Sequence, residues 1–428
     1  KTSLAVLVSI VLLSAVFAPT VLAPQPPVDP NTLIFGTIGM PTRADPATAL
    51  VNCSFTTWPV PGYVNVARVY LDAISGEPYF HPGIDILAPN GTPVNATVGG
   101  KCIKSEGEVI WIDVLNQHEV VHEYGHITNL QKNVGDDVVE GDYLGDIRDW
   151  DPVPDQDHLH FAIFNFAGTK TLDNPLHTLT MFTDTTEPLI IQGEEAGPSA
   201  TNPFNLTKDD GGGDGGVNKD AGPNGEWIIW GKIDVYMQIR DDNGAKTQGQ
   251  PPQVAYGGAY KVGYALWRYD TEEWVYGTDA NPKWLIICDG EPPWNYGEGY
   301  DYFTMVYDAP NCNWLENDFV YIVTNNAAGD GSYASLSKGS CWNTKVHKDG
   351  TGDATRNLDA KYSDGLYKIH GQARDVKDNA GTAGMDVRVD NFRPSVVEVT
   401  PLNETMNVPV NTEITVTFSE KMNRATVQ

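Results

Sequence analysis

His81-Pro-Gly-Ile-Asp85 and His158-Leu-His160 are the two stretches that decide how this sequence folds and what it binds. The proline and glycine of the first stretch disfavour a helix, and in an extended segment side chains at positions i, i+2 and i+4 share one face. His81 and Asp85 are therefore predicted to point the same way. Zinc in hydrolases takes three nitrogen or oxygen ligands and leaves its fourth position to water. The two stretches supply such a set, with one imidazole left for catalysis.

The second stretch has the pattern of a strand. Leu159, Phe161 and Ile163 alternate with His158 and His160, so the apolar side chains are predicted to be buried and both histidines to lie on the other face. Taken alone, the two histidines are equally compatible with polar residues on an exposed strand. The carboxylate and imidazole of the first stretch favour a metal site.

Four motifs follow one another in this region. They are Tyr79-Phe-His-Pro-Gly-Ile-Asp-Ile-Leu-Ala-Pro-Asn-Gly-Thr-Pro-Val94, Tyr124-Gly-His126, Val134-Gly-Asp-Asp-Val-Val-Glu-Gly-Asp-Tyr-Leu-Gly145 and His158-Leu-His-Phe161. In this order and at these separations they resemble the lysostaphin/LytM-type zinc metalloendopeptidases of peptidase family M23. The resemblance covers about a third of the chain.

The resemblance implies a fold, a site and an activity. It makes His81, Asp85 and His160 the ligands of one zinc ion, and it places His126 and His158 beside the attacking water, without saying which of the two is the base. The implied fold is a mainly β, antiparallel metallopeptidase domain of the β-barrel-sandwich-hybrid type, with the metal in a groove across the sheet. The implied reaction is amide hydrolysis in peptidoglycan cross-links or stems. An exported proteinase acting on glycine-rich proteins, and a non-catalytic wall-binding or adhesion protein, are the alternatives.

Two positions depart from the family pattern. Asp149-Trp-Asp-Pro-Val-Pro-Asp-Gln-Asp157 is acidic and proline-bearing where the family is usually rich in glycine and threonine. We expect this loop to border the cleft and to present carboxylates to the substrate. Ala162 stands where the family often has glutamate, and this change has no obvious bearing on the metal.

A competing motif lies inside the same region. His122-Glu-Tyr-Gly-His126 fits the His-Glu-x-x-His signature of helical zinc proteases, in which the glutamate, here Glu123, is the base. Its flanks favour strands, because Glu108–Leu115 is rich in β-forming residues and Val134–Gly145 has glycines at turn-like positions. A helix between them would be short and would lack an apolar stripe.

We therefore predict a strand over residues 118–126. In a strand, His118, His122, Tyr124 and His126 share one face, and Glu123 faces away from them. His118 and His122 are then predicted to be solvated, and His126 is available for catalysis.

The charge of the chain excludes some functions. With 56 acidic and 28 basic residues, its formal net charge is −28. A protein this acidic is not expected to bind nucleic acid or anionic lipid, and it is not expected to adhere to polyanionic cell walls by charge alone. Attachment to a wall would need specific contacts.

The N-terminus is typical of an exported protein. Residues 1–23 begin with Lys1, continue with an uncharged apolar run and close on small residues, which predicts a secretory signal. The run is shorter than the roughly 20 apolar residues that span a bilayer, although a retained membrane anchor is the alternative. Residues 24–45 are predicted to be a linker. We expect the protein to be secreted or held at the cell surface.

Composition divides the rest of the chain. We predict the zinc peptidase domain at 46–190 and an acidic, glycine-rich linker at 191–224, whose aspartates offer an alternative as a calcium site. From 225 to 393 the sequence is tryptophan-rich, with Ile233 to Ile239 alternating as in a half-buried strand, and resembles an Ig-like β-sandwich. Residues 394–428 resemble the start of a truncated bacterial Ig-like domain, which could attach the protein to a cell surface.

Overall fold

A computed structural model gives the structure of this chain. It describes residues 55–71, 73–74, 77–116, 119–150, 157–165, 171–179, 182–191, 203–209, 214–219, 221–241, 257–288, 298–308, 312, 319–355 and 357–419. All of them belong to one compact unit, Asp45–Gln428. The predicted signal segment 1–23, the linker 24–45 and His118 lie outside the described residues.

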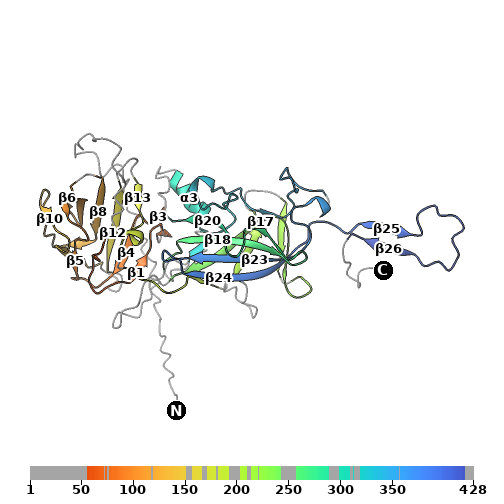
Figure 1. The fold of residues 1–428 in the computed structure, drawn as a ribbon, viewed down its shortest axis with the longest axis horizontal. Coiled ribbons are helices and arrows are strands. Elements are labelled where there is room, and N and C mark those ends of the chain that lie inside the picture. The colour runs from red at the N-terminus through yellow and green to blue at the C-terminus, as the bar shows by residue number, and fades with distance from the viewer. Residues whose placement is uncertain are drawn as a thin grey trace, which may run out of the picture. The chain divides into compact units, whose positions relative to one another are not determined.

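The fold is mainly β with antiparallel sheets, as the sequence predicted. An eight-stranded sheet carries His158–His160 and the end of the His81–Asp85 stretch, in the order β1-β4-β12-β8-β7-β6-β10, with β13 on β12 (Figure 1). Its strands are β1 (Val66–Arg68), β4 (Ile84–Leu87), β12 (His158–Asn165), β8 (Val120–Gly125), β7 (Val109–Val114), β6 (Gly100–Glu106), β10 (Asp137–Val138) and β13 (Thr171–Asp173). The central strands β4, β12 and β8 hold the candidate site residues or lie next to them.

Smaller elements complete this part of the chain. A three-stranded sheet has the order β5-β11-β9, with β5 (Pro93–Asn95), β11 (Tyr143–Ile147) and β9 (Ile127–Thr128). A two-stranded sheet pairs β2 (Ala73–Ile74) with β3 (Glu77–Phe80), and α2 (Pro175–Thr178) follows β13. Asn174 caps α2 by accepting a hydrogen bond from the backbone N–H of Leu176.

The alternation predicted for the His158 stretch is confirmed. Leu159 and Phe161 are fully buried and Ile163 is 1% exposed, whereas His158 and His160 are partly exposed on the opposite face. Burying each of these apolar side chains stabilises the fold by about 1.5–3 kcal/mol. The core therefore fixes which face of β12 presents the imidazoles.

His122 is buried in this core, so the prediction that it is solvated is wrong. Its ring packs against Phe55 and Phe161, and its Nδ1 shares a 2.7 Å hydrogen bond with the Thr97 hydroxyl, which lies 2.6 Å from the Tyr124 hydroxyl. Burial lowers the pKa of His122 to about 3. The imidazole is therefore neutral and serves the packing of the domain.

Replacing this histidine should change how stability depends on pH. The unfolded imidazole binds a proton below about pH 6.5, while the folded one stays neutral down to about pH 3, so acid favours the unfolded state across that interval. As the pH falls over this range, the free energy of unfolding of wild type should decrease by about 1.4 kcal/mol per pH unit more than that of His122→Phe. Urea unfolding at a series of pH values measures both slopes, and equal slopes would contradict a neutral buried His122.

Gly83 lies where β4 approaches β12, between two candidate ligands. A Cβ at this position would overlap the carbonyl oxygen of Phe161 and lie 3.0 Å from the Cβ of Ala162. At Gly99 a Cβ would meet nothing closer than the carbonyl oxygen of Val138 at 3.4 Å, which is ordinary contact.

Gly83→Ala is therefore expected to destabilise the domain by about 1–3 kcal/mol, because the overlap forces β4 and β12 apart. Gly99→Ala is the matched control and should change stability by less. Thermal unfolding compares the two variants with wild type. Equal melting temperatures for both variants would count against the tight approach at Gly83.

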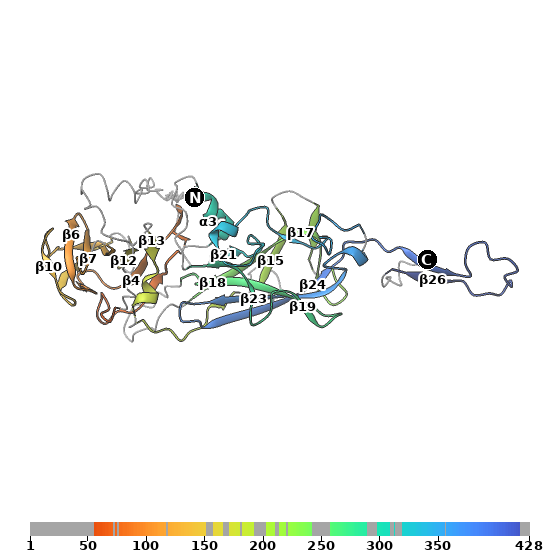
Figure 2. The same ribbon diagram turned by 45° about the horizontal axis from the view of Figure 1, so that its top comes forward.

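An eleven-stranded sheet follows, with the order β14-β17-β24-β23-β18-β19 (Figure 2). Strands β15, β16, β21 and β22 also pair with β17, and β20 pairs with β18. The bounds are β14 (Leu189–Ile190), β15 (Phe204–Lys208), β16 (Gly215–Asn218), β17 (Trp227–Arg240), β18 (Lys261–Arg268), β19 (Glu273–Tyr276), β20 (Lys283–Ile287), β21 (Phe319–Ile322), β22 (Trp342–Asn343), β23 (Gly365–Arg374) and β24 (Ala380–Val389). Helix α3 (Glu298–Val306) and the 3-10 turns Tyr333–Ser335 and Asn357–Asp359 lie between strands.

Strand β17 organises this sheet. Ile233, Val235, Met237 and Ile239 are fully buried, which confirms the predicted alternation. The strands β15 and β16 come from the segment 191–224 that was predicted to be a linker, and both pair with β17. Part of that segment therefore belongs to the sheet.

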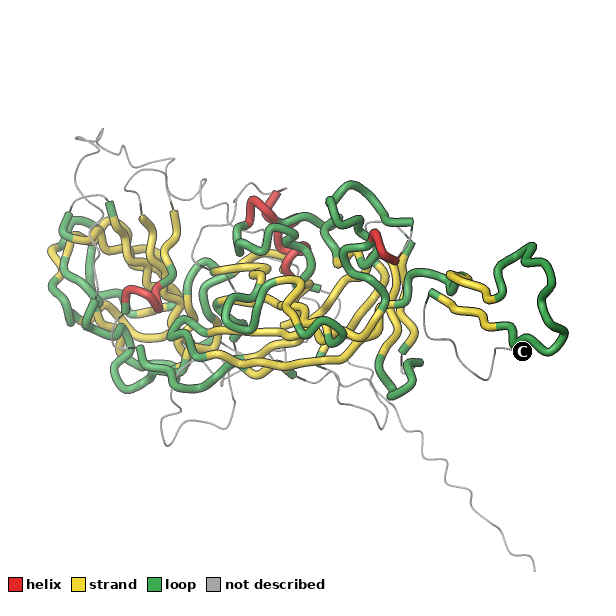
Figure 3. Tube along the Cα trace, turned by 45° about the vertical axis from the view of Figure 1, so that its right-hand side comes forward, coloured by secondary structure: helices red, strands yellow, loops and turns green. Residues whose placement is uncertain are grey.

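The described chain ends in a two-stranded sheet of β25 (Val396–Thr400) and β26 (Thr415–Phe418), seen as the last pair of yellow strands in Figure 3. It lies within the segment predicted to begin an Ig-like domain. Among the described residues, none of the helices is long and apolar enough to cross a membrane.

Candidate metal centre

The pairing of β4 with β12 brings two candidate ligands together. The strands run antiparallel, and Asp85 lies directly opposite His160 in the register. Residues so paired have Cβ atoms about 5 Å apart on one face of the sheet. His81 precedes β4 and is 3% exposed, and the backbone N–H of Leu71 donates to its carbonyl oxygen over 2.8 Å.

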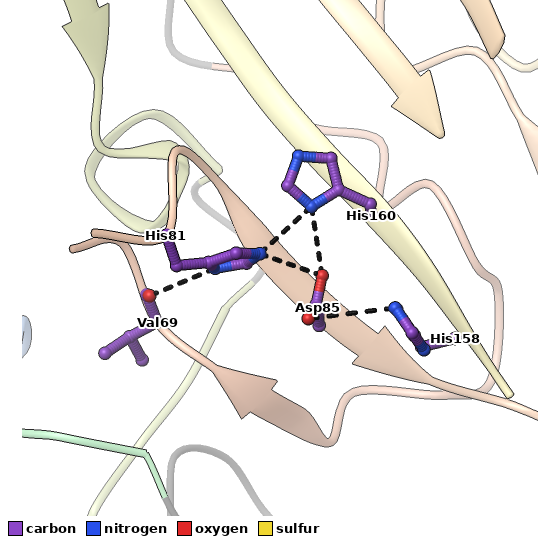
Figure 4. Close-up of polar contacts among 5 residues, drawn as sticks. All are labelled: Val69, His81, Asp85, His158 and His160. Carbon is purple, nitrogen blue, oxygen red and sulfur yellow. Dashed lines mark hydrogen bonds and ion pairs between the residues drawn. The ribbon is translucent and has the colours of Figure 1, made fainter. Parts of the chain in front are cut away.

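Three potential ligand atoms converge at this point (Figure 4). His81 Nε2 lies 3.0 Å from His160 Nδ1 and 3.1 Å from Asp85 Oδ1, and His160 Nδ1 lies 3.0 Å from the same Asp85 oxygen. The three residues form one of two groups of potential metal ligands among the described residues. The structure thus brings together all three residues that the resemblance made zinc ligands.

The donor set fits a zinc ion. Two imidazole nitrogens and one carboxylate oxygen, each at about 2.0–2.2 Å from zinc, would lie about 3.3 Å from one another in a tetrahedral site, close to the separations seen here. The other ring nitrogen of His81, Nδ1, lies 3.4 Å from the carbonyl oxygen of Val69. A carbonyl partner of this kind fixes the tautomer of a ligating histidine.

Electrostatics keep the carboxylate ionised. Burial alone raises the pKa of Asp85, but the charges of His81 and His158 and hydrogen bonds from the histidines outweigh it, so the pKa lies well below its ordinary value. Burial lowers the pKa of His160, whereas the hydrogen bond and charge of Asp85 and the charge of Glu123 raise it, and the net direction is upward. The carboxylate is therefore the anionic centre of the cluster.

Two further histidines border this cluster. His158 Nε2 lies 3.7 Å from Asp85 Oδ2, and the rings of His126 and His158 have their centroids 4.8 Å apart. The centroid of His126 lies 5.9 Å from that of His160. Burial and the charges of His158 and His160 lower the pKa of His126 to about 3, so its imidazole is neutral. The five predicted site residues thus form one cluster.

His126 reaches this cluster by a turn rather than by strand alternation. His122 and Tyr124 on β8 face the core, and alternation alone would send His126 the same way. Strand β8 ends at Gly125, and His126 has a φ of +61°, in the left-handed region. The prediction that His122, Tyr124 and His126 share one face is therefore wrong, because the chain turns at His126.

The helical His-Glu-x-x-His interpretation is also excluded by β8, which is a strand. His122 and His126 lie on opposite sides of the sheet and cannot bind one metal. Glu123 is paired with Ala162 on the face that carries His160, and its charge acts on that imidazole. The prediction that Glu123 faces away from His122 is confirmed, and Glu123 lies on the face of the sheet that carries the candidate ligand His160.

Trp150, in the acidic loop, is a neighbour of the cluster that the sequence did not predict. Its ring centroid lies 4.6 Å from that of His126 and 5.1 Å from that of His158. In the sequence this loop is distinguished by its charge, and residues 151–156 lie outside the described residues. The spacing of Trp150, His126 and His158 along the chain does not reveal that their rings are in contact.

The second group of potential ligands consists of Asp184, Asp241 and Asp375. The Asp184 carboxylate accepts from the backbone N–H of Thr186, and that of Asp375 accepts from the backbone N–H of Asn379. These carboxylates stabilise turns. In the described part of the segment 208–220 there is no such group, so the calcium site suggested for that segment is not supported.

Comparison with known proteins finds a family match in the part of the chain that holds the site. Residues 79–173 match peptidase family M23. This part of the chain is similar to M23 peptidases. The match runs from just before His81 to the end of β13, so all five clustered residues lie inside it. Residues 390–428 match a bacterial Ig-like domain, and no curated protein matches the chain.

Solved structures similar to this chain include M23 proteins. The catalytic domain of the prophage-encoded M23 protein EnpA from Enterococcus faecalis, a point mutant, is 25% identical, with 28% of this chain and 95% of that chain covered and a TM-score of 0.23. The catalytic domain of the antimicrobial peptidase lysostaphin from Staphylococcus simulans is 26% identical, with 27% and 87% covered and a TM-score of 0.21. A zinc-containing peptidase from Vibrio cholerae is 21% identical, with 27% and 37% covered and a TM-score of 0.23.

Glu123→Gln tests the rejected helical motif. If Glu123 were the base, this change should lower kcat by a factor of about 10²–10⁴. Because Glu123 is on a strand and His122 is buried, we expect kcat at saturating zinc to stay within a few-fold of wild type. Peptidase assays on both proteins, with zinc content measured in parallel, decide the matter, and a loss of several hundredfold with full zinc occupancy would restore the helical interpretation.

Proposed function

We propose that this protein is a secreted zinc metalloendopeptidase that hydrolyses amide bonds in the peptide cross-links or stems of peptidoglycan. The observation that carries the proposal is the convergence of His81, Asp85 and His160, with three ligating atoms within 3.0–3.1 Å of one another inside an M23 peptidase domain. In this proposal the three residues hold one zinc ion.

Zinc bound at this position would polarise the scissile carbonyl and make the attacking water more acidic. The protein supplies the proton transfer. His126 is neutral, which is the form of an imidazole that accepts a proton. His158 Nε2 lies 3.7 Å from Asp85 Oδ2, and in this proposal His158 stabilises negative charge on the substrate oxygen. The exchange of these two roles is the alternative assignment.

The net charge of −28 bears on how the substrate is found. An acidic protein is repelled by anionic wall polymers, so we propose that it recognises the peptide rather than the charge of the wall. The Ig-like domain at 390–428 is compatible with attachment to a surface. Export, proposed from the sequence of residues 1–23, would bring the enzyme to this substrate.

Two classes of substitution should separate metal binding from proton transfer. His81→Ala and His160→Ala each remove a ligand, so both should lose stoichiometric zinc and all measurable hydrolysis. His126→Ala and His158→Ala should keep zinc and lose about 10²–10⁴-fold in kcat. Inductively coupled plasma mass spectrometry measures the zinc, and release of new amino groups from purified peptidoglycan measures the hydrolysis.

The same assay distinguishes the alternative functions. Hydrolysis of glycine peptides without hydrolysis of peptidoglycan would favour an exported proteinase on glycine-rich proteins. Zinc binding with no hydrolysis of either substrate would favour a non-catalytic wall-binding protein. A wild-type protein without stoichiometric zinc, or activity that survives His81→Ala, would overturn the proposal.

A further inference from the structure

Trp150 lies against both histidines that do not belong to the ligand set. Its indole meets the ring of His126 edge to face at 75°, with the centroids 4.6 Å apart, and it is tilted by 50° to the ring of His158 at 5.1 Å. The two histidine rings are 4.8 Å apart. Every pair in this cluster of three rings is therefore in contact, and aromatic pairs at such distances attract one another.

The indole is held by its other neighbours as well. The guanidinium carbon of Arg148 lies 4.5 Å from the centre of the Trp150 ring, and Arg148 forms an ion pair with Glu108. The backbone N–H of Arg148 donates to the carbonyl oxygen of His126 over 3.0 Å. The arginine thus ties the indole to the turn that carries His126.

Asp157 fixes the main chain of the tryptophan. The Asp157 carboxylate is buried, and it accepts hydrogen bonds from the backbone N–H of Trp150 at 2.8 Å and of Asn90 at 3.0 Å. Asp157 immediately precedes His158 in the sequence. The residue immediately before β12 therefore also positions Trp150, and this gives a second link between the indole and the histidines.

We propose that Trp150 is a positioning residue that holds the imidazoles of His126 and His158 in the orientation that proton transfer requires. His126 lies in a turn with positive φ, where regular strand pairing does not restrict its side chain. A ring packed on both imidazoles removes their alternative rotamers. Misplacement of a catalytic group by about 1 Å can cost a factor of about 10² in rate. This inference rests on the proposed function.

The first test uses a measurement that does not depend on activity. In the zinc-loaded protein labelled with ¹³C-histidine, the indole ring current should shift the ring signals of His126 and His158, which are assigned with His126→Ala and His158→Ala. Trp150→Leu keeps apolar volume but has no ring, so both signals should move. The matched control is Trp111→Leu, because Trp111 also lies under a cation, Lys104, and next to an aromatic ring, whereas its register partner on β8 is Glu123 and neither of the two histidines.

The second test is kinetic. Trp150→Leu should bind zinc stoichiometrically and lose about 10–100-fold in kcat with little change in KM, whereas Trp150→Phe, which restores a ring, should recover most of kcat.

Unmoved histidine signals in Trp150→Leu would overturn the inference, and so would a rise in KM with kcat unchanged. If wild type hydrolyses no substrate, the proposed function fails, and the histidine signals still decide whether Trp150 positions the two rings. If Trp150→Leu does not fold, Trp150→Phe is used in its place. The inference is then supported only if both histidine signals move and the loss of kcat is smaller than that of His126→Ala.

Discussion

The antiparallel pairing of β4 with β12 is the constraint on which the site depends. In this register Asp85 faces His160, and their flanking residues Ile84 and Phe161 are paired and fully buried. A slip of one residue would turn the apolar side chains outward and the ligands into the core, because side chains alternate with a period of two. The hydrophobic core and the candidate metal centre are thus specified by the same register, and the absence of a side chain at Gly83 allows the approach of β4 to β12.

Two histidines of this region, His122 and His126, have different surroundings in the folded chain. His122 is neutral because it is buried among apolar rings and bonded to a hydroxyl, and it contributes packing. His126 is also neutral, but it lies beside His158 and the ligands because the chain turns after β8. Four residues of sequence separate a structural imidazole from one in the site. The difference arises where β8 ends and the chain turns at His126, and the residue type is the same.

The acidic loop before β12 has more than one role in the structure. In the sequence this loop is distinguished by its negative charge, which departs from the family pattern. In the folded chain its two described ends matter through packing and hydrogen bonding: Trp150 contacts the imidazoles, and Asp157 accepts two backbone N–H groups. A carboxylate that bonds to backbone amides is committed to the structure and is not available to a substrate. The departure from the family therefore bears on the geometry of the site as well as on its charge.

The sequence by itself determined the β class and the inward face of β12, and its resemblance to M23 peptidases named the three residues that converge. The strand face follows from local alternation, which survives folding because it is a property of adjacent positions. Only the tertiary structure decided that His122 is buried, that His126 leaves its strand face, that β15 and β16 join the sheet of β17, and that Trp150 meets two histidines. Burial and ring contacts depend on which distant segments meet, and a turn with positive φ at a histidine has no signature in the sequence.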